Sequence, residues 1–162
     1  MKRQQGFTLT ELIIAVVIIG VLISFAVPGY VKQVKTARRA DAQSSLRQLA
    51  NAMERYYTKN PAGMSYAGAT LDPASTAPPP IMTQWVPRDG NATTANYELM
   101  ILSADDSEFV IAAVPVAGNP QAADECGAFL MNSRTQVGNL LGATNGSTPD
   151  ASVPAKIDGC WN

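Results

Sequence analysis

The chain has 162 residues, a net charge of −1, two cysteines and no histidine. Without histidine, and with two cysteines far apart in sequence, a zinc centre or a Cys/His nucleophile would need unusual ligands or bases. The paired carboxylates, Asp105-Asp106 with Glu108 and Asp124-Glu125, lie among turn-forming residues, where solvated acids at strand ends are common. We therefore expect no catalytic site, no metal and no cofactor.

The first predicted element is an apolar run from residue 5 to residue 31 that contains one acid, Glu11. The twenty residues from Leu12 to Val31 carry no charge, and as a helix they span about 30 Å, the thickness of a bilayer core. A carboxylate near the centre of such a helix costs roughly 2.5–3.5 kcal/mol. The run therefore predicts a membrane-spanning helix in which Glu11 has a function and a partner.

The flanking charges predict the orientation of this helix. Lys2 and Arg3 precede the run, and the positive-inside tendency places them in the cytoplasm, although a second basic flank begins at Lys32. An ordinary signal peptide is the alternative, because Ser24-Phe25-Ala26 has the small-x-small pattern of a cleavage site. The run continues past that site and includes the charged Glu11, and both features favour a retained anchor.

Beyond the apolar run, hydrophobic residues recur at steps of three and four, the pattern of an amphipathic helix. These residues are Val31, Val34, Ala42, Leu46, Leu49, Met53 and Tyr56 or Tyr57. Asn60-Pro61 ends the pattern, because proline disfavours the helical conformation of the preceding residue. The sequence predicts one helix of about fifty residues, roughly 75 Å long, whose second half is covered by the C-terminal half of the chain.

Two later stretches have no regular pattern. Residues 61–92 are rich in Pro, Gly, Ala, Ser and Thr, which predicts an irregular surface loop anchored by Ile81 and Trp85. Residues 142–159 are turn-rich and need Cys160 to hold them in place.

Between these stretches the residues alternate between apolar and polar, as in strands with one buried face. Tyr97, Leu99 and Ile101 share one face of the first strand. The four predicted strands cover residues 96–102, 109–116, 126–132 and 135–140. The predicted fold class is α+β, with a long N-terminal helix packed on a four-stranded antiparallel sheet and a C-terminal region bounded by a disulfide.

That disulfide would join Cys126 to Cys160, because both residues lie in the part of the chain expected outside the cytoplasm, where disulfides persist. It would close a loop of about 35 residues and stabilise the fold by about 3–4 kcal/mol in the loop-entropy model. Two buried free thiols are the alternative.

Charge divides the chain into a basic helix and an acidic head. Residues 32–59 carry seven basic residues against two acids, and residues 60–162 carry three against ten. This complementarity favours contact between the helix and an acidic head, in the same chain or in a neighbour, although two separate solvated faces are also consistent. Binding of DNA by the basic cluster at residues 32–39 is a weaker option, since that cluster adjoins the membrane.

The residues Gly6-Phe7-Thr8-Leu9-Thr10-Glu11, opening an apolar helix that contains Gly20 and Pro28, closely resemble the N-terminal signature of type IV pilins. That signature combines a class III leader ending in glycine, an aromatic first mature residue, an acid four residues later and an apolar helix. Secretion-system pseudopilins share it. The later segments are similar to type IVa pilins of the PilE-like minor kind: Glu54-Arg55-Tyr56-Tyr57, Ala112-Ala113-Val114-Pro115, Cys126-Gly127 and Gly159-Cys160-Trp161. The long loop and Arg134-Thr135-Gln136 depart from that pattern.

The resemblance implies that a prepilin peptidase cleaves after Gly6 and methylates the new amine of Phe7. This amine becomes a cation that needs an anion within lipid, and Glu11, at the positive end of the helix dipole, can supply it to an adjacent subunit. Removing one partner of such a pair costs about 3–5 kcal/mol, although a complete pair adds little stability. We therefore expect Glu11 to set the register between subunits.

The resemblance also suggests that the helix unwinds between Gly20 and Pro28 when subunits pack into a filament. Proline removes one backbone donor and weakens a helix interior by about 3 kcal/mol. A kink, which membrane helices tolerate, is the alternative.

The predicted segments are a leader (1–6), a transmembrane or filament-core helix (7–31), the amphipathic half of that helix (32–59), an irregular loop (60–95) and a β-sheet head (96–162). The expected partners are other pilin subunits, the peptidase that also methylates, the inner-membrane pilus assembly machinery and the inner membrane itself. Nucleic acid is a weaker expectation.

The expected function is structural. The chain would cross the inner membrane once, with a cytoplasmic N-terminus, and then enter an extracellular type IV pilus that serves twitching motility, adhesion or DNA uptake. The alternatives are a type II secretion pseudopilin and a membrane-anchored binding module that forms no polymer.

Overall fold

The structure is a computed structural model that describes residues 7–60, 63–76, 78–145 and 149–161. The chain divides into two compact units, residues 1–36 and residues 37–162, here called the N-terminal unit and the head. Among the described residues, one α-helix runs through both units in sequence, and every strand belongs to the head.

Helix α1 (Leu9–Lys59) contains 51 residues and confirms the long helix predicted from the sequence. It begins directly after Thr8, whose hydroxyl accepts a hydrogen bond from the first turn. It ends at Lys59, directly before Asn60, the first residue of the dipeptide predicted to stop it. In the head, its buried positions follow the predicted stripe: Ala42, Leu46, Leu49 and Met53.

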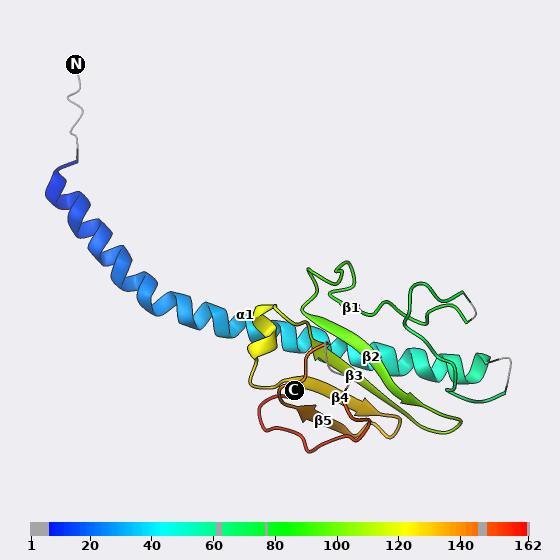
Figure 1. Cartoon of the computed structure of the whole chain (residues 1–162). Helices are drawn as coiled ribbons and strands as arrows, with labels where there is room; N and C mark the ends of the chain where they lie inside the picture. The colour runs from blue at the N-terminus through cyan, green and yellow to red at the C-terminus, as the bar shows by residue number, and fades with distance from the viewer. Residues whose placement is uncertain (1–6, 61–62, 77, 146–148, 162) are drawn as a thin grey trace. The chain divides into compact units, whose positions relative to one another are not determined.

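The head contains a five-stranded antiparallel sheet in which each strand pairs with the next in sequence (Figure 1). The strands are β1 (Trp85–Val86), β2 (Tyr97–Ala104), β3 (Phe109–Pro115), β4 (Ala128–Asn132) and β5 (Val137–Leu140). The predicted fold is confirmed, with one strand more than the four expected. Strand β1 escaped prediction because it has two residues, lies in the proline-rich stretch, and is followed by Pro87, which has no N–H for a strand ladder.

The main core lies between α1 and one face of this sheet. Tyr97 and Leu99 of β2, predicted to share a face, are buried there, and Ile101 is partly buried beside them. The other strands contribute Phe109, Ile111, Ala113, Phe129 and Met131. The alternation seen in the sequence of β2 is therefore the alternation between this core and the opposite face.

The opposite face of the sheet is also covered. Ala112, Val114, Ala128 and Leu130 form a second cluster with Ala143, and Val153 of the tail packs against it. The tail approaches so closely that a Cβ at Gly138 would lie 1.9 Å from the Pro154 carbonyl oxygen. Because both faces are covered, β3 and β4 show little alternation of polar and apolar residues.

The loop before β1 is fastened by several side chains. Ile81 packs against the core as predicted, whereas Trp85 is only half-buried. Tyr66, Leu71 and Met82 are the loop residues that enter the core. A short 3-10 helix, η1 (Pro120–Ala123), connects β3 to the segment before β4.

Candidate assembly helix and head groove

The N-terminal unit exposes large apolar side chains around its whole helix. Within α1 their exposed fractions range from 49% at Val31 to 78% at Phe25, and Phe7, which precedes the helix, is 89% exposed. By length and composition, α1 is the one helix in the described residues that is long and apolar enough to cross a membrane. A helix that is apolar on every side needs lipid or other helices around it.

Thr8 and Glu11 form a capping box at the start of α1. The Thr8 backbone N–H and hydroxyl donate to Glu11 Oε2 at 3.0 and 2.7 Å, and the Glu11 N–H donates back to Thr8 Oγ1 at 3.3 Å. The box satisfies donors that have no partner within the helix. Sequence reasoning gave Glu11 a partner in a neighbouring subunit and missed this local role, which the Thr-x-x-Glu spacing signals.

The other predicted positions of this unit are placed as follows. Phe7 is exposed directly before Thr8, and Gly6 lies outside the described residues. Gly20 and Pro28 both lie inside α1, which stays helical between them. A Cβ at Gly20 would meet nothing within 4 Å, so packing inside the chain does not require this glycine. Local unwinding remains a prediction about assembled subunits.

The predicted disulfide is confirmed in the head. Cys126 and Cys160 are joined, with their Cα atoms 5.6 Å apart. Gln43 of α1 donates from Nε2 to the Cys160 carbonyl oxygen at 2.7 Å, and the Trp161 indole N–H donates to the Gly138 carbonyl oxygen at 3.3 Å. The end of the tail is therefore fixed to both the helix and the sheet.

Arg39 joins α1 to the segment before Cys126. Its Nε donates to the two carboxylate oxygens of Asp124 at 3.0 and 3.1 Å, and its Nη2 donates to Glu125 Oε1 at 3.0 Å. Burial opposes the guanidinium charge, but the hydrogen bonds to Asp124 and Glu125 outweigh it and raise the pKa of Arg39. Asp124 is fully buried, whereas Glu125 is largely exposed. The predicted attraction between basic helix and acidic head is present at this point within the chain.

A buried hydrogen-bond network extends from this ion pair. Gln121 Nε2 donates to Asp124 Oδ2 at 2.7 Å and to the Tyr97 hydroxyl at 2.9 Å, and the Cys126 N–H donates to Asp124 Oδ1 at 2.8 Å. Burial raises the pKa of Tyr97, which keeps its hydroxyl neutral. The network fixes the segment that carries Cys126.

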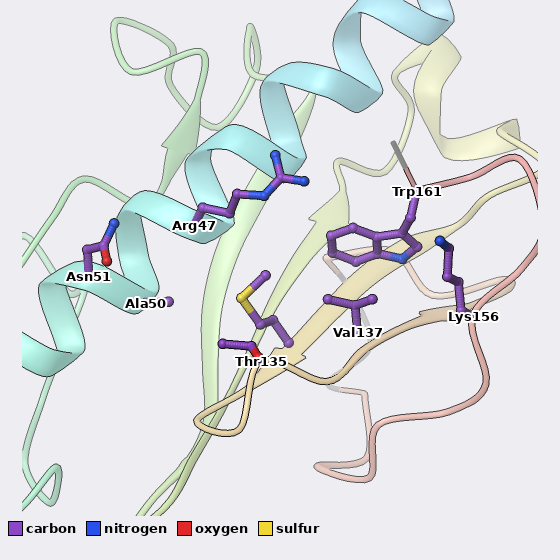
Figure 2. A pocket seen from close by; sticks show the side chains of 8 residues that line it. Arg47, Ala50, Asn51, Thr135, Val137, Lys156 and Trp161 are labelled. Carbon is purple, nitrogen blue, oxygen red and sulfur yellow. The ribbon is translucent and has the colours of Figure 1, made fainter.

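A groove runs between α1, the β4–β5 turn and the tail (Figure 2). It has a volume of about 450 Å³, an apolar floor and two basic side chains. The lining residues are Arg47, Ala50, Asn51, Met131, Thr135, Val137, Lys156 and Trp161. Sequence reasoning missed the groove, because its residues come from three segments far apart in the chain.

A second, more polar hollow also borders α1 and shares Asn51 with the groove. Gln48, Asn51 and Arg55 of the helix face Arg88 across a volume of about 280 Å³. Ile81 and Met82 complete its lining. Two guanidinium groups and two amides form a set of donors suited to an anion.

Comparisons with known proteins decide the family. A family described as type IV minor pilin ComP, DNA uptake sequence receptor, matches residues 28–130, and the prokaryotic N-terminal methylation motif matches residues 1–27. The chain belongs to this type IV pilin family. The resemblance found in the sequence is thus confirmed, and because pilins are structural subunits, this pilin is not an enzyme.

Curated relatives cover both branches of the superfamily. The pilin is 35% identical over 57 residues to the type IV major pilin protein PilA of Myxococcus xanthus. It is 38% identical over 60 residues to the type II secretion system core protein G of Vibrio cholerae, and 33% identical over 92 residues to that of Dickeya chrysanthemi. These matches cover 35%, 37% and 55% of this chain and 26%, 41% and 58% of the respective relatives, so the chain spans less than two thirds of each relative's length.

Proposed function

We propose that this pilin is a subunit of a type IV pilus, held in the inner membrane by α1 before it enters the filament. The observation that carries the proposal is the uncovered apolar surface from Phe7 to Val31. Glu11 lies near its N-terminal end, and the folded head follows it in sequence. Lipid covers such a surface before assembly, and the same surfaces of neighbouring subunits cover it in a filament.

Processing belongs to this proposal. A prepilin peptidase cleaves after Gly6 and methylates Phe7, and inner-membrane machinery then adds the subunit to the filament. Intact-mass and N-terminal fragment spectra of the mature protein should show a methylated Phe7. A mature chain beginning at Val27 would instead identify an ordinary signal peptide and remove the anchor.

Glu11 is proposed to pair with the Phe7 amine of a neighbour while remaining in its capping box. The two roles are separable, because glutamine also completes a capping box but has no charge, whereas Thr8→Ala breaks the box and keeps the charge. Glu11→Gln should leave the membrane level of the subunit normal and deplete it from sheared filaments. Thr8→Ala should have the weaker effect on filaments. If Glu11→Gln entered filaments as well as the wild type, the pairing with Phe7 would be wrong.

A pseudopilin of a type II secretion system is the second candidate, favoured by the relatives from Vibrio and Dickeya. Quantitative mass spectrometry of sheared surface filaments separates the two candidates, together with a secretion assay after deletion of the gene. A pilus subunit should be present in the filaments and leave secretion intact. A pseudopilin should give the reverse result, and a membrane-anchored binding module should enter no polymer.

A role in DNA uptake is a further proposal within the pilus. The description of the matching family names a DNA uptake sequence receptor, and Arg55 and Arg88 in the polar hollow offer two cations to phosphate groups. The doubly substituted Arg55→Gln/Arg88→Gln protein should bind duplex DNA more weakly and with a smaller dependence on salt. Unchanged affinity across the salt series would exclude this hollow as the contact.

A further inference from the structure

The lining of the groove beside Trp161 has an apolar part and a charged part. The apolar part of the lining, here called the floor, consists of Met131, Val137, Ala50 and Trp161. Lys156, whose side chain is exposed, lines the groove from the tail (Figure 2). No carboxylate lines the groove among the described residues. The chemistry of the groove therefore suits an apolar side chain that has acidic neighbours.

Lys156 supplies a positive charge to this groove. Its side chain is exposed, and within the described residues it has no ion pair. Arg47 adds a guanidinium to the lining but has other contacts of its own, so we place the acid of an incoming partner beside Lys156.

The head also carries a projection with the complementary chemistry. Met64 is 73% exposed, and the loop that carries it is tied to the β2–β3 turn. The Ser65 hydroxyl donates to Asp106 Oδ1 at 2.8 Å, and the Tyr66 N–H donates to the Asp105 carbonyl oxygen at 3.0 Å. An exposed methionine is thus held beside two exposed carboxylates. We call Met64, Asp105 and Asp106 the acidic knob.

The other exposed large apolar side chain among the described residues of the head is Leu141. It has no acid within residues 139–144, so it lacks the charge that the groove would select. Met64 also has the flexible, unbranched side chain that adapts to irregular apolar hollows. The acidic knob is the better match for the groove.

We propose that the acidic knob of one copy of this pilin occupies the Trp161 groove of a second copy, with Met64 on the apolar floor and Asp106 beside Lys156. Within one chain the knob is solvent-exposed, so the occupant has to come from another molecule. Knob and groove are different surfaces, and a contact between different surfaces that does not close into a ring propagates as an open helical filament. The inference rests on the proposed filament and names one contact within it.

Cross-linking of the full-length protein in its own cells tests the contact. One copy carries Met64→Cys and the other carries Asn51→Cys, which lies on the groove wall. The two are co-expressed, and the filaments are sheared from the cells and treated with a short bismaleimide. The expected result is a dimer that contains one copy of each variant. Leu141→Cys paired with Asn51→Cys is the matched control and should give no dimer. No dimer from the Met64 pair, or a cross-link to a different protein, would overturn the proposal.

Charge exchange tests the contact independently of cysteines. Lys156→Glu and Asp106→Lys should each lower the filament fraction of the subunit by about two- to fivefold, the effect of one solvent-exposed ion pair. The chain that carries both changes should recover, because the exchanged charges again attract. Asp89→Lys reverses an exposed acid outside the knob and should have no effect.

The outcomes distinguish this contact from the proposed function. Wild-type protein missing from filaments would refute the pilus proposal itself. Wild-type protein in filaments, with both single variants incorporated normally, would refute only the knob-and-groove contact. Loss of DNA binding by Lys156→Glu, with normal incorporation, would assign the groove to nucleic acid and also overturn the proposal.

Discussion

The ion pair between Arg39 and Asp124 should be the most sensitive polar contact of the head. Arg39→Met keeps most of the side-chain volume and leaves Asp124 as a buried carboxylate, with hydrogen bonds from Gln121 and Cys126 but no cation. Removing one partner of a buried pair costs about 3–5 kcal/mol. The Asp124 side chain is fully buried and that of Arg39 is 13% exposed. We expect the lower end of the range, about 3 kcal/mol, since water can reach the arginine site.

Two matched variants isolate the cause of this loss. Glu125 contacts the same guanidinium but is 77% exposed, so Glu125→Gln should cost at most about 1 kcal/mol. Arg39→Met combined with Asp124→Asn removes the unpaired charge. In the described structure Gln121 Oε1 has no partner, and a rotation of that amide would let it accept from the new side chain at position 124. The double variant should therefore be more stable than Arg39→Met alone.

Urea unfolding of the full-length protein in detergent, followed by tryptophan fluorescence, measures these differences because Trp161 lies in the core. With an m-value of about 1–3 kcal/mol/M, a loss of about 3 kcal/mol moves the midpoint down by at least about 1 M. The reasoning would be refuted if Arg39→Met lay within about 1 kcal/mol of the wild type. It would also be refuted if the double variant were no more stable than the single one.

The remaining predictions concern the tail and the alkaline stability of the head. Cys160→Ser should lower the free energy of unfolding by about 3–4 kcal/mol. Protease should then cut the tail earlier than it cuts the helix, which timed digestion with peptide mapping would show. Burial, followed by the hydrogen bond to Glu54, raises the pKa of Tyr66 to about 12. The stability that the neutral Tyr66 hydroxyl contributes is therefore complete below about pH 10 and is lost as the pH rises through 12. Urea unfolding at stepped alkaline pH should show this loss of stability, and Tyr66→Phe should make the loss smaller. Gly138→Ala would place a Cβ against the backbone of Pro154 and should cost about 1–3 kcal/mol in the same unfolding assay.

The sequence predicted the parts of the fold that depend on local pattern. The stripe of Leu46, Leu49 and Met53 identifies the packed face of α1, because a helix covered on one side repeats its apolar residues every three or four positions. The disulfide followed from the expected oxidising compartment, and the pilin signature was carried by residues 6–11. The helix stripe and the pilin signature each lie within a short stretch of sequence. The disulfide was predicted from the oxidising environment expected for the head.

The parts that escaped prediction depend on segments that meet only in the folded head. Nothing near Arg39 in sequence indicates that its partner lies at Asp124, since several acids of the head were equally available. The covered outer face of the sheet depends on Gly138, and a lone glycine in a short strand does not reveal which backbone passes beside it. The Trp161 groove likewise has no local signal. The capping box at Thr8 is different, because its spacing was visible and was not used.

The charge division of the chain bears on how heads can meet. Within the described residues, ion pairs at Arg39 join the basic helix to the acidic head. Arg55 of the helix lines the polar hollow, and Lys156 of the tail lines the Trp161 groove. Two copies related by a two-fold axis through the Trp161 groove would bring like charges together, which costs free energy when solvent is excluded. Contact between the basic groove of one copy and an acidic surface of the next avoids that cost. Such contacts use two different surfaces, and that is the geometry from which open filaments are built.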